Sequence, residues 1–393
     1  MAVDSGRSRR LGFVAATVAL VAAFAASAAP IPLYGIYRAS DGLTYGDLSL
    51  TAVAYFAGAV TSLLVFGRLS NHLGRRPVIL LSLGLAAIAS LILLDVPNVM
   101  PLILGRVLLG LACGLASSAT AAFLIDNAPA NPPWLGAAIS SSAPMIGLTI
   151  GALGSGTLAE YGTMPRTLPY LGAVAILLAG ACLIVMSHET VPRQPGALLS
   201  LRPTIGLPRA SRRLFPVASC TFVATWALGG FYQAFGPSMA TDQFGSSNAL
   251  VSAAVFSSLM APSAIAGPLA GRLSPAGAQR VGMVAFTLAA AGVLLSLHAA
   301  AVVPFLAASA LAGAAQGATL TGSIRALLAR ALPDERAGAF AVIFATSYSG
   351  AAIPSFVAGQ FSRSMNLLDI ASGYGALALA ACAVTLFAAR NPD

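Results

Sequence analysis

The chain has 393 residues, of which 58% are hydrophobic and only 8% are charged. A soluble globular domain carries about 25% charged residues, so this composition excludes a soluble fold, and the high apolar content excludes a disordered chain. All 21 basic residues are arginines, and the formal net charge is +9. They lie singly or in short groups rather than in one patch, so nucleic acid is not an expected partner. What remains is a multi-pass protein of the lipid bilayer.

Apolar runs of membrane-spanning length recur along the whole chain, because a helix needs about 20 apolar residues to cross the hydrocarbon core. The first run follows several arginines and resembles a signal peptide, but eleven further runs favour a helix that is retained. The expected spans are residues 11–34, 48–66, 78–94, 99–125, 135–158, 168–187, 214–236, 249–270, 281–297, 302–328, 338–361 and 371–389.

A polar segment, residues 188–213, separates the sixth span from the seventh. It holds prolines and arginines throughout, so it is too polar to insert and too rich in proline to form one long helix. We therefore expect an N-terminal six-helix bundle over residues 1–187, a cytoplasmic linker over 188–213 and a C-terminal six-helix bundle over 214–393.

The two halves repeat each other. Gly67-Arg-Leu-Ser-Asn corresponds to Gly267-Pro-Leu-Ala-Gly, and Gly110-Leu-Ala-Cys-Gly corresponds to Gly313-Ala-Ala-Gln-Gly. Such spacing indicates a duplicated unit. The predicted fold class is an all-α integral membrane protein with twelve transmembrane helices in two pseudo-symmetric bundles.

The arginines also predict the orientation. Most of them fall on the side of the N-terminus, and only Arg38, Arg166 and Arg363 fall in loops on the opposite side. Because cytoplasmic loops carry an excess of basic residues, both termini are expected in the cytoplasm, with the protein in the cytoplasmic (inner) membrane.

The loop after the second span reads Gly67-Arg-Leu-Ser-Asn-His-Leu-Gly-Arg-Arg-Pro-Val. It resembles the signature G-x-L-[AG]-D-R-x-G-R-[RK] of the major facilitator superfamily of secondary transporters, a resemblance that extends over essentially the whole chain. Gly67 would allow close helix approach, Gly74 would allow a tight turn, and Arg75 and Arg76 would face helix ends and carboxylates.

This loop departs from the signature at two positions, because Asn71 replaces its aspartate and His72 replaces the following arginine. In the family, that aspartate joins a charge network that latches the outward-open state. The resemblance implies a gating contact between Arg75 and Asp126, with Asn71 contributing hydrogen bonds but no charge. The latch is therefore expected to be weaker than in relatives.

Arg106 lies inside the fourth span, where a charge is costly unless it faces a cavity or a partner. Its spacing to Gly110 and Gly114 matches the family pattern R-x-x-x-G-x-x-x-G, in which the arginine is tied to proton coupling. The alternative is a structural role in which Arg106 donates hydrogen bonds to carbonyls of the first helix.

The fifth span contains Ser142-Ala-Pro-Met-Ile-Gly-Leu-Thr-Ile-Gly, which resembles the antiporter signature G-P-x-x-G-G of the drug and sugar efflux branch. Pro144 and Gly147 match, and Gly151 continues a face of small residues. The resemblance favours export. The same residues would also serve ordinary close packing, with no bearing on direction.

Acidic residues are expected only near the membrane boundaries. The candidates for proton exchange, besides Arg106, are therefore Asp47 at the start of the second span and Glu160 at the end of the fifth. Both positions equally suit a solvated charge at a helix end. The absence of an acidic residue at mid-membrane argues against strongly cationic substrates.

Polar and aromatic residues within spans are candidates to contact a substrate in a central cavity, since such a mixture suits amphipathic organic molecules. The histidines and cysteines show no metal-ligand spacing, and the sequence has no phosphate-binding glycine loop and no nucleophile with a positioned base, so neither a metal, a cofactor nor enzyme activity is expected. The candidate contacts are Tyr55, Trp226, Tyr232, Gln233 and Gln316.

The leading hypothesis is a secondary active transporter that exports amphipathic compounds or metabolites in exchange for protons, with a small molecule as its partner. The family resemblance implies a monomer. An uptake symporter or facilitator for a neutral nutrient such as a sugar is the alternative within the same fold. A membrane receptor or scaffold without transport is an alternative from another class.

Overall fold

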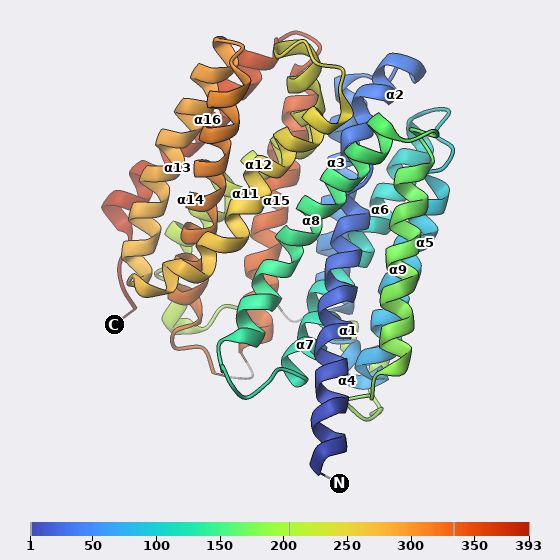
Figure 1. Cartoon of the computed structure of the whole chain (residues 1–393). Coiled ribbons are helices and arrows are strands. Elements are labelled where there is room, and N and C mark those ends of the chain that lie inside the picture. Colours follow the sequence, from blue (N-terminus) through green and yellow to red (C-terminus); the bar gives the residue numbers. More distant parts are fainter. Residues whose placement is uncertain (1, 204, 333–334, 393) are drawn as a thin grey trace.

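The computed structural model describes residues 2–203, 205–332 and 335–392. Within these ranges, twelve helical spans are long and apolar enough to cross a membrane, which confirms the predicted fold class (Figure 1). The spans are formed by α1 (Ala2–Ala28) with α2 (Tyr34–Asp41), α3 (Tyr45–Thr61), α5 (Arg75–Ile92), α6 (Val99–Leu115) with α7 (Ala121–Asp126), α8 (Leu135–Tyr161), α9 (Leu168–Met186), α11 (Phe215–Ser238), α12 (Ala249–Leu269), α13 (Pro275–His298), α14 (Val302–Leu328), α15 (Arg336–Phe361) and α16 (Leu367–Ala388); short helices α4 (Ser70–Leu73) and α10 (Ala197–Ser200) lie between spans.

Several helices begin earlier than the apolar runs indicate, because their first turns are polar but capped. Helix α13 begins at Pro275 instead of residue 281, and the hydroxyl of Ser274 accepts a hydrogen bond from the backbone N–H of Gly277 (3.1 Å). Asn366 caps α16 in the same way. A capping residue followed by proline or an acidic residue is a start signal that hydropathy alone does not register.

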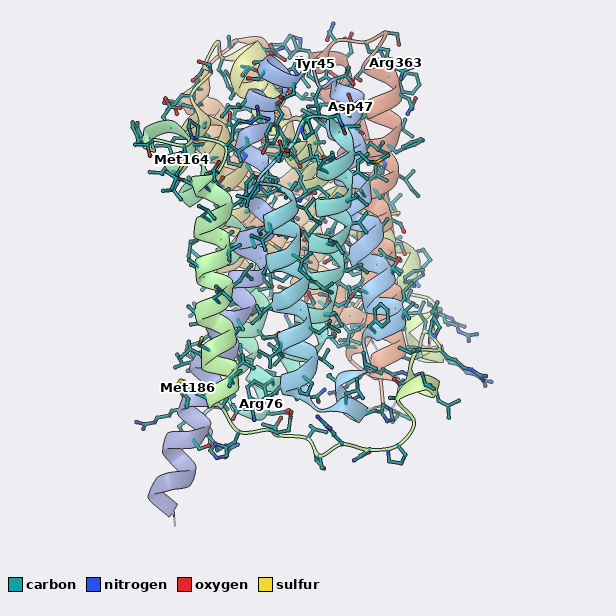
Figure 2. All side chains as sticks on the ribbon, turned by 90° about the vertical axis from the view of Figure 1, so that its right-hand side faces the viewer. Tyr45, Asp47, Arg76, Met164, Met186 and Arg363 are labelled. Carbon is teal, nitrogen blue, oxygen red and sulfur yellow. The ribbon has the colours of Figure 1, made fainter. Side chains whose placement is uncertain are left out.

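The helices pack as two halves. Helices α1 to α9 contact one another through pairs such as α3 with α6 and α1 with α8, and α11 to α16 do so through pairs such as α12 with α14. Both chain termini lie at the same end of the bundle (Figure 1). We call this end, which carries Arg76, the termini side, and the opposite end, which carries Asp47, the far side (Figure 2).

The internal repeat appears as matching glycine contacts. A Cβ atom on Gly110 of α6 would collide with the backbone carbonyl of Tyr55 on α3, and a Cβ atom on Gly313 of α14 would collide with the carbonyl of Leu259 on α12. Without a hydrophobic driving force between helices in lipid, such close backbone approach provides the packing energy. The same device at equivalent places supports the duplicated unit.

The two halves meet along two seams, α8 with α12 and α3 with α15. At the far side, polar contacts close these seams. Arg38 forms a salt bridge with Asp242 (3.0 Å), and the Tyr45 hydroxyl donates a hydrogen bond to the same carboxylate. The hydroxyl of Ser49 donates to the carbonyl of Ser355. The protein is therefore closed on its far side in this conformation.

The segment between α9 and α11 lies against the N-terminal half. The backbone N–H of Gln194 donates to the carbonyl of His72 (2.8 Å), and the guanidinium of Arg68 donates to the carbonyls of Ser200 and Arg202 (3.4 and 2.9 Å). The expected linker is thus attached to one half along much of its length.

Candidate functional site

A central cavity lies between the halves. Its wall comes from helices of both, and its volume is only about 50 Å³. Sites for drug-sized ligands measure about 300–1,000 Å³, so the walls must separate before such a ligand can enter. The lining residues are Phe24, Tyr55, Met145 and Leu148 from the N-terminal half, and Trp226, Gly229, Gln233, Phe256, Met260, Gln316 and Tyr348 from the C-terminal half.

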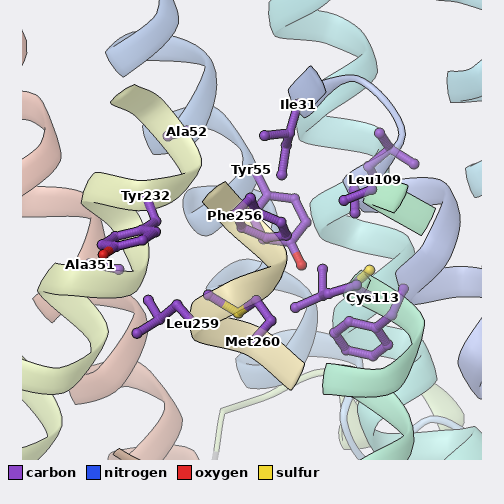
Figure 3. Packing of buried hydrophobic residues seen from close by; sticks show 14 of the residues in the cluster. Ile31, Ala52, Tyr55, Leu109, Cys113, Tyr232, Phe256, Leu259, Met260 and Ala351 are labelled. Atoms are coloured by element: carbon purple, nitrogen blue, oxygen red, sulfur yellow. The ribbon is translucent and has the colours of Figure 1, made fainter. Parts of the chain in front are cut away.

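Aromatic rings of the cavity wall are linked by ring contacts, partly through Phe56 behind the lining. Trp226 and Tyr348 meet edge to face with ring centroids 4.7 Å apart, and Tyr348 also lies 6.0 Å from Phe56. Phe56 in turn packs against Tyr55 at 5.4 Å. Figure 3 shows Tyr55 of α3 near Phe256 and Met260 of α12. Offset and edge-to-face contacts of this kind hold ring positions well defined.

Two buried amide side chains enter the cavity, Gln233 from α11 and Gln316 from α14. Only 4% and 5% of their surfaces are exposed, and neither Oε1 atom has a hydrogen-bond partner among the described residues. Buried polar atoms are normally paired, so an unpaired amide that faces a cavity indicates a place where a ligand or water completes the bonding.

Arg106 lies directly behind this wall and is fully buried. Its Nη1 donates to the carbonyl of Ser27 on α1 (2.7 Å), and its guanidinium carbon lies 4.5 Å from the centroid of the Tyr55 ring. Its Nε and Nη2 atoms have no hydrogen-bond partner in the part of the chain that the structure describes. The carbonyl contact matches the structural alternative, and the contact with Tyr55 connects Arg106 to the cavity.

Of the predicted substrate contacts, Tyr55, Trp226, Gln233 and Gln316 meet at the cavity, but Tyr232 does not. Its hydroxyl lies 2.5 Å from the Ser309 hydroxyl, and its ring stacks on Phe305. Neighbouring residues on a helix point about 100° apart, so Gln233 and Tyr232 cannot both face the cavity.

Sequence reasoning missed seven lining residues. Most are apolar residues or a glycine inside apolar spans and carry no local signal that separates them from the core. Tyr348 is the exception, since a phenol hydroxyl within a span indicates an interior position as it does for Tyr55. The missed residues are Phe24, Met145, Leu148, Gly229, Phe256, Met260 and Tyr348.

The predicted Arg75–Asp126 contact is present on the termini side. Arg75 Nε lies 3.2 Å from Asp126 Oδ2, and Arg75 Nη1 donates to the side-chain oxygen of Asn71 (2.6 Å). Glu189, which sequence reasoning did not identify, accepts hydrogen bonds from the backbone N–H groups of Arg75 and Arg76 (2.8 and 2.9 Å). Its carboxylate therefore caps α5 at the end where the helix dipole favours negative charge.

The other loop residues have separate local roles. Gly74 has a φ angle of +93°, which provides the expected tight turn before α5. Arg76 donates to the carbonyls of Ile184 and Val185 at the end of α9 (3.0 and 2.5 Å). For Gly67 the expected reason was wrong: a Cβ atom there would meet the carbonyl of Leu63, so the glycine relieves crowding within its own turn and not against another helix.

The two far-side carboxylates predicted from the sequence, Asp47 and Glu160, accept hydrogen bonds from different partners. Asp47 accepts hydrogen bonds from the backbone N–H and hydroxyl of Thr44 (2.8 and 2.7 Å), which makes a capping box at the start of its own helix. Glu160 accepts instead from the backbone N–H of Ala249, the first residue of α12 (2.9 Å), and so joins the two halves.

The residues of the antiporter-like segment form a helix contact. Cβ atoms on Gly147 and Gly151 would collide with backbone atoms of Val21 and Ala25, respectively, so α8 approaches α1 closely here. Pro144 lies within α8, in the same segment. The contact lies inside the N-terminal half and bears on its packing.

Comparison with known proteins agrees with this architecture. A mutant of the nucleoside transporter NupG has a crystal structure that matches 96% of this chain and 100% of its own, with a TM-score of 0.70 and 13% sequence identity, which shows the fold alone. Two proteins described as uncharacterized transporters match by sequence: one from Rickettsia bellii (strain RML369-C), 31% identical over 169 residues, and one from Rickettsia felis (strain ATCC VR-1525 / URRWXCal2), 28% identical over 158 residues.

These two matches cover 41% and 38% of this chain and only 38% and 36% of the relatives' own lengths. The family profile extends further: the one described as Major Facilitator Superfamily matches residues 12–355, most of the chain, and spans both halves and the cavity between them. The chain therefore belongs to the major facilitator superfamily, whose members are secondary transporters and not enzymes.

Proposed function

We propose that the protein exports small amphipathic organic molecules across the cytoplasmic membrane in exchange for protons, with its termini side in the cytoplasm. The observation that carries this proposal is the central cavity, which lies next to the buried Arg106 and is lined by aromatic side chains and by two amides whose Oε1 atoms have no partner among the described residues. The moving bodies in this proposal are residues 1–187 and 214–393, which rock about the cavity so that it opens to each side in turn.

Arg106 is assigned to coupling because it contacts both a helix and the cavity wall. It holds the carbonyl of Ser27 on α1 and faces the ring of Tyr55, so a substrate that displaces Tyr55 changes the surroundings of a buried charge. A buried charge whose Nε and Nη2 donors lack partners in the described part of the chain responds strongly to such a change, since there is little water to compensate.

Glu160 is the stronger of the two carboxylate candidates for proton exchange. Its carboxylate accepts a hydrogen bond from the first residue of α12 in the other half, so protonation would weaken a charge-assisted contact that holds the far side closed. Asp47 is held by Thr44 of its own helix start, and its protonation has no direct route to the opposite half.

The direction of transport and the role of the loop rest on the family resemblance. The segment with Pro144, Gly147 and Gly151 resembles the exporters' signature, which favours efflux. The contact of Arg75 with Asp126 and Asn71 is proposed as the termini-side gate. A neutral side chain at position 71 makes this gate easier to open than one with a full charge network.

The experiment uses inverted membrane vesicles with an inside-acid pH gradient, a pH-sensitive dye and a panel of lipophilic compounds, sugars and organic acids. We expect at least one amphipathic compound to dissipate the gradient only in vesicles that contain the protein. If compounds accumulate in these vesicles without any proton movement, coupled exchange is refuted and a facilitator takes its place.

Two variants with the same chemical change test the coupling residues. Glu160→Gln should reduce proton movement per substrate, whereas Asp47→Asn should leave it unchanged, because only Glu160 contacts the other half.

Arg106→Ala should abolish the pH dependence of transport, and Arg106→Lys, which keeps a charge, should retain part of it. Unchanged pH dependence in Arg106→Ala would show that this arginine is only structural.

A further inference from the structure

We propose that the central cavity takes uncharged, planar aromatic compounds that carry an amide-like edge, in which an N–H donor and a carbonyl acceptor are adjacent, as in a lactam. This inference rests on the proposed function and narrows it from amphipathic molecules in general to one chemical class. Three features of the lining support it: the amides, the aromatic rings and the charges.

The amides supply complementary hydrogen bonding. Gln233 and Gln316 are more than nine-tenths buried, both line the cavity, and the Oε1 atom of each lacks a partner among the described residues. A primary amide offers an acceptor and a donor side by side. A lactam edge presents the opposite pair in the same plane, so its N–H can donate to the Oε1 of one glutamine while its carbonyl accepts from the Nε2 of the other, which gives each glutamine one contact.

The aromatic wall favours a flat ring over a sugar. Trp226 and Tyr348, 4.7 Å apart, offer surfaces on which a planar ring can pack, and Met145 and Met260 add flexible thioethers that adapt to its outline. A sugar carries several hydroxyl groups that each need a partner on burial, whereas most of this lining is apolar. The lining therefore argues against the sugar alternative.

The charges favour a neutral ligand. None of the described residues that line the cavity is acidic, so a buried cation would lack a counter-charge from them. Arg106 carries a positive charge behind the ring of Tyr55, with its guanidinium 4.5 Å from the ring centroid, and Arg106 itself is not part of the lining. Its field opposes a cation, and Tyr55 separates it from direct contact with an anion.

The two tryptophans of the chain allow binding to be measured without transport. Trp134 is 63% exposed at the start of α8, whereas Trp226 lines the cavity. In purified protein, Trp134→Phe leaves Trp226 as the only indole fluorophore. The reverse variant, Trp226→Phe, keeps Trp134 and measures quenching that does not come from the cavity.

Three probes of similar size separate the hypotheses: carbostyril, an aromatic lactam; N-methylcarbostyril, which lacks the N–H donor; and N-methylquinolinium, a cation. We expect carbostyril to quench Trp226 saturably, N-methylcarbostyril to bind about tenfold more weakly because one amide contact is lost, and the cation to give only background quenching.

Isosteric variants test the amides. Gln233→Met and Gln316→Met should each weaken carbostyril binding by about tenfold and reduce the preference over N-methylcarbostyril. Gln360→Met, at an exposed position near the end of α15, serves as the matched control and should bind like the parent. Size-exclusion chromatography identifies any variant that fails to fold, and one folded amide variant is enough to read the effect.

Equal binding of the methylated lactam, tighter binding of the cation, or no saturable quenching by carbostyril in folded protein would each overturn the proposed substrate class. The assay uses neither a gradient nor flux, so it is independent of the proton-exchange test. If carbostyril binds as expected but no compound moves protons, the coupling proposal fails while the ligand class stands. If a compound is transported with protons but does not compete with carbostyril, the ligand class fails while the coupling proposal stands.

Discussion

Replacing Asp242 with asparagine should open the far side of the protein without unfolding either half. The carboxylate of Asp242 accepts from Arg38 and from the Tyr45 hydroxyl, so one side chain of the C-terminal half fastens two residues of the N-terminal half. Asparagine keeps the size and shape but removes the charge on which both contacts depend.

The expected size of the effect follows from the exposure of the pair. The side chains of Arg38 and Asp242 are 24% and 32% exposed, so the ion pair contributes about 0.5–1 kcal/mol, as partly solvated pairs do. Loss of the charge-assisted bond from Tyr45 adds about 0.5–1 kcal/mol. A total of roughly 1–2 kcal/mol corresponds to a factor of about 5–30 in the ratio of closed to open molecules.

A cysteine at position 253 reports this ratio. Ala253 on α12 is fully buried at the far-side seam, where it faces Gly156 of α8, so a cysteine there is protected until the seam opens. In a background in which the four native cysteines are replaced by serine or alanine, the rate of labelling by a membrane-impermeant maleimide from the far side should rise about 5–30-fold with Asp242→Asn.

Asp41→Asn is the matched control. It removes a similar pair, Asp41 with Arg166 (2.7 Å), but this pair lies within the N-terminal half. The control should leave the labelling rate unchanged. An equal rise in both variants would refute the reasoning, since general loosening and not release of the inter-half contact would then explain the result. A rate within twofold of the parent in Asp242→Asn would also refute it.

Three further outcomes are expected. Arg75→Glu should slow transport of a verified substrate, and adding Asp126→Arg should partly restore the rate; a double variant no faster than the single one would count against the pairing. Asn71→Asp places a carboxylate where the amide oxygen lies 2.6 Å from Arg75 and should raise stability by about 0.5–1 kcal/mol, seen as a higher melting temperature at low salt. Gly110→Ala should lower stability by about 1–3 kcal/mol because the added methyl group meets a backbone carbonyl, whereas Gly84→Ala, with open space around it, should not lower it; a Gly110→Ala protein as stable as the parent would contradict the packing argument.

The sequence predicts the fold well because membrane spans are strong, local signals. Hydropathy locates all twelve helices, and the errors are confined to ends such as that of α13, where a serine cap and a proline begin the helix before the apolar run. The contact of Arg75 with Asp126 was also predictable, since the family resemblance relates two positions that are distant in the sequence.

The site was only partly predictable, because its geometry depends on which face each helix turns inward. Gln233 and Tyr232 are neighbours with similar polar character, yet one faces the cavity and the other bonds to Ser309. The salt bridge of Arg38 with Asp242 joins residues in different halves, and no periodicity in the chain relates them. Such contacts follow from how the two bundles meet, which local patterns do not encode.

The attachment of the linker to the N-terminal half has a consequence for how the two bodies are tethered. Gln194, Ser200 and Arg202 are held by that half, and the hydroxyl of Ser211 donates to the carbonyl of Leu327 in the other half (2.6 Å), so the leash that joins the bundles is at most the short stretch between residues 202 and 211. A short leash keeps its two ends at roughly millimolar effective concentration, so the seams need only weak contacts to reassemble after each opening. A protein expressed as two separate pieces should accordingly be divided beyond Arg202, so that the docked part of the linker stays with the bundle that binds it.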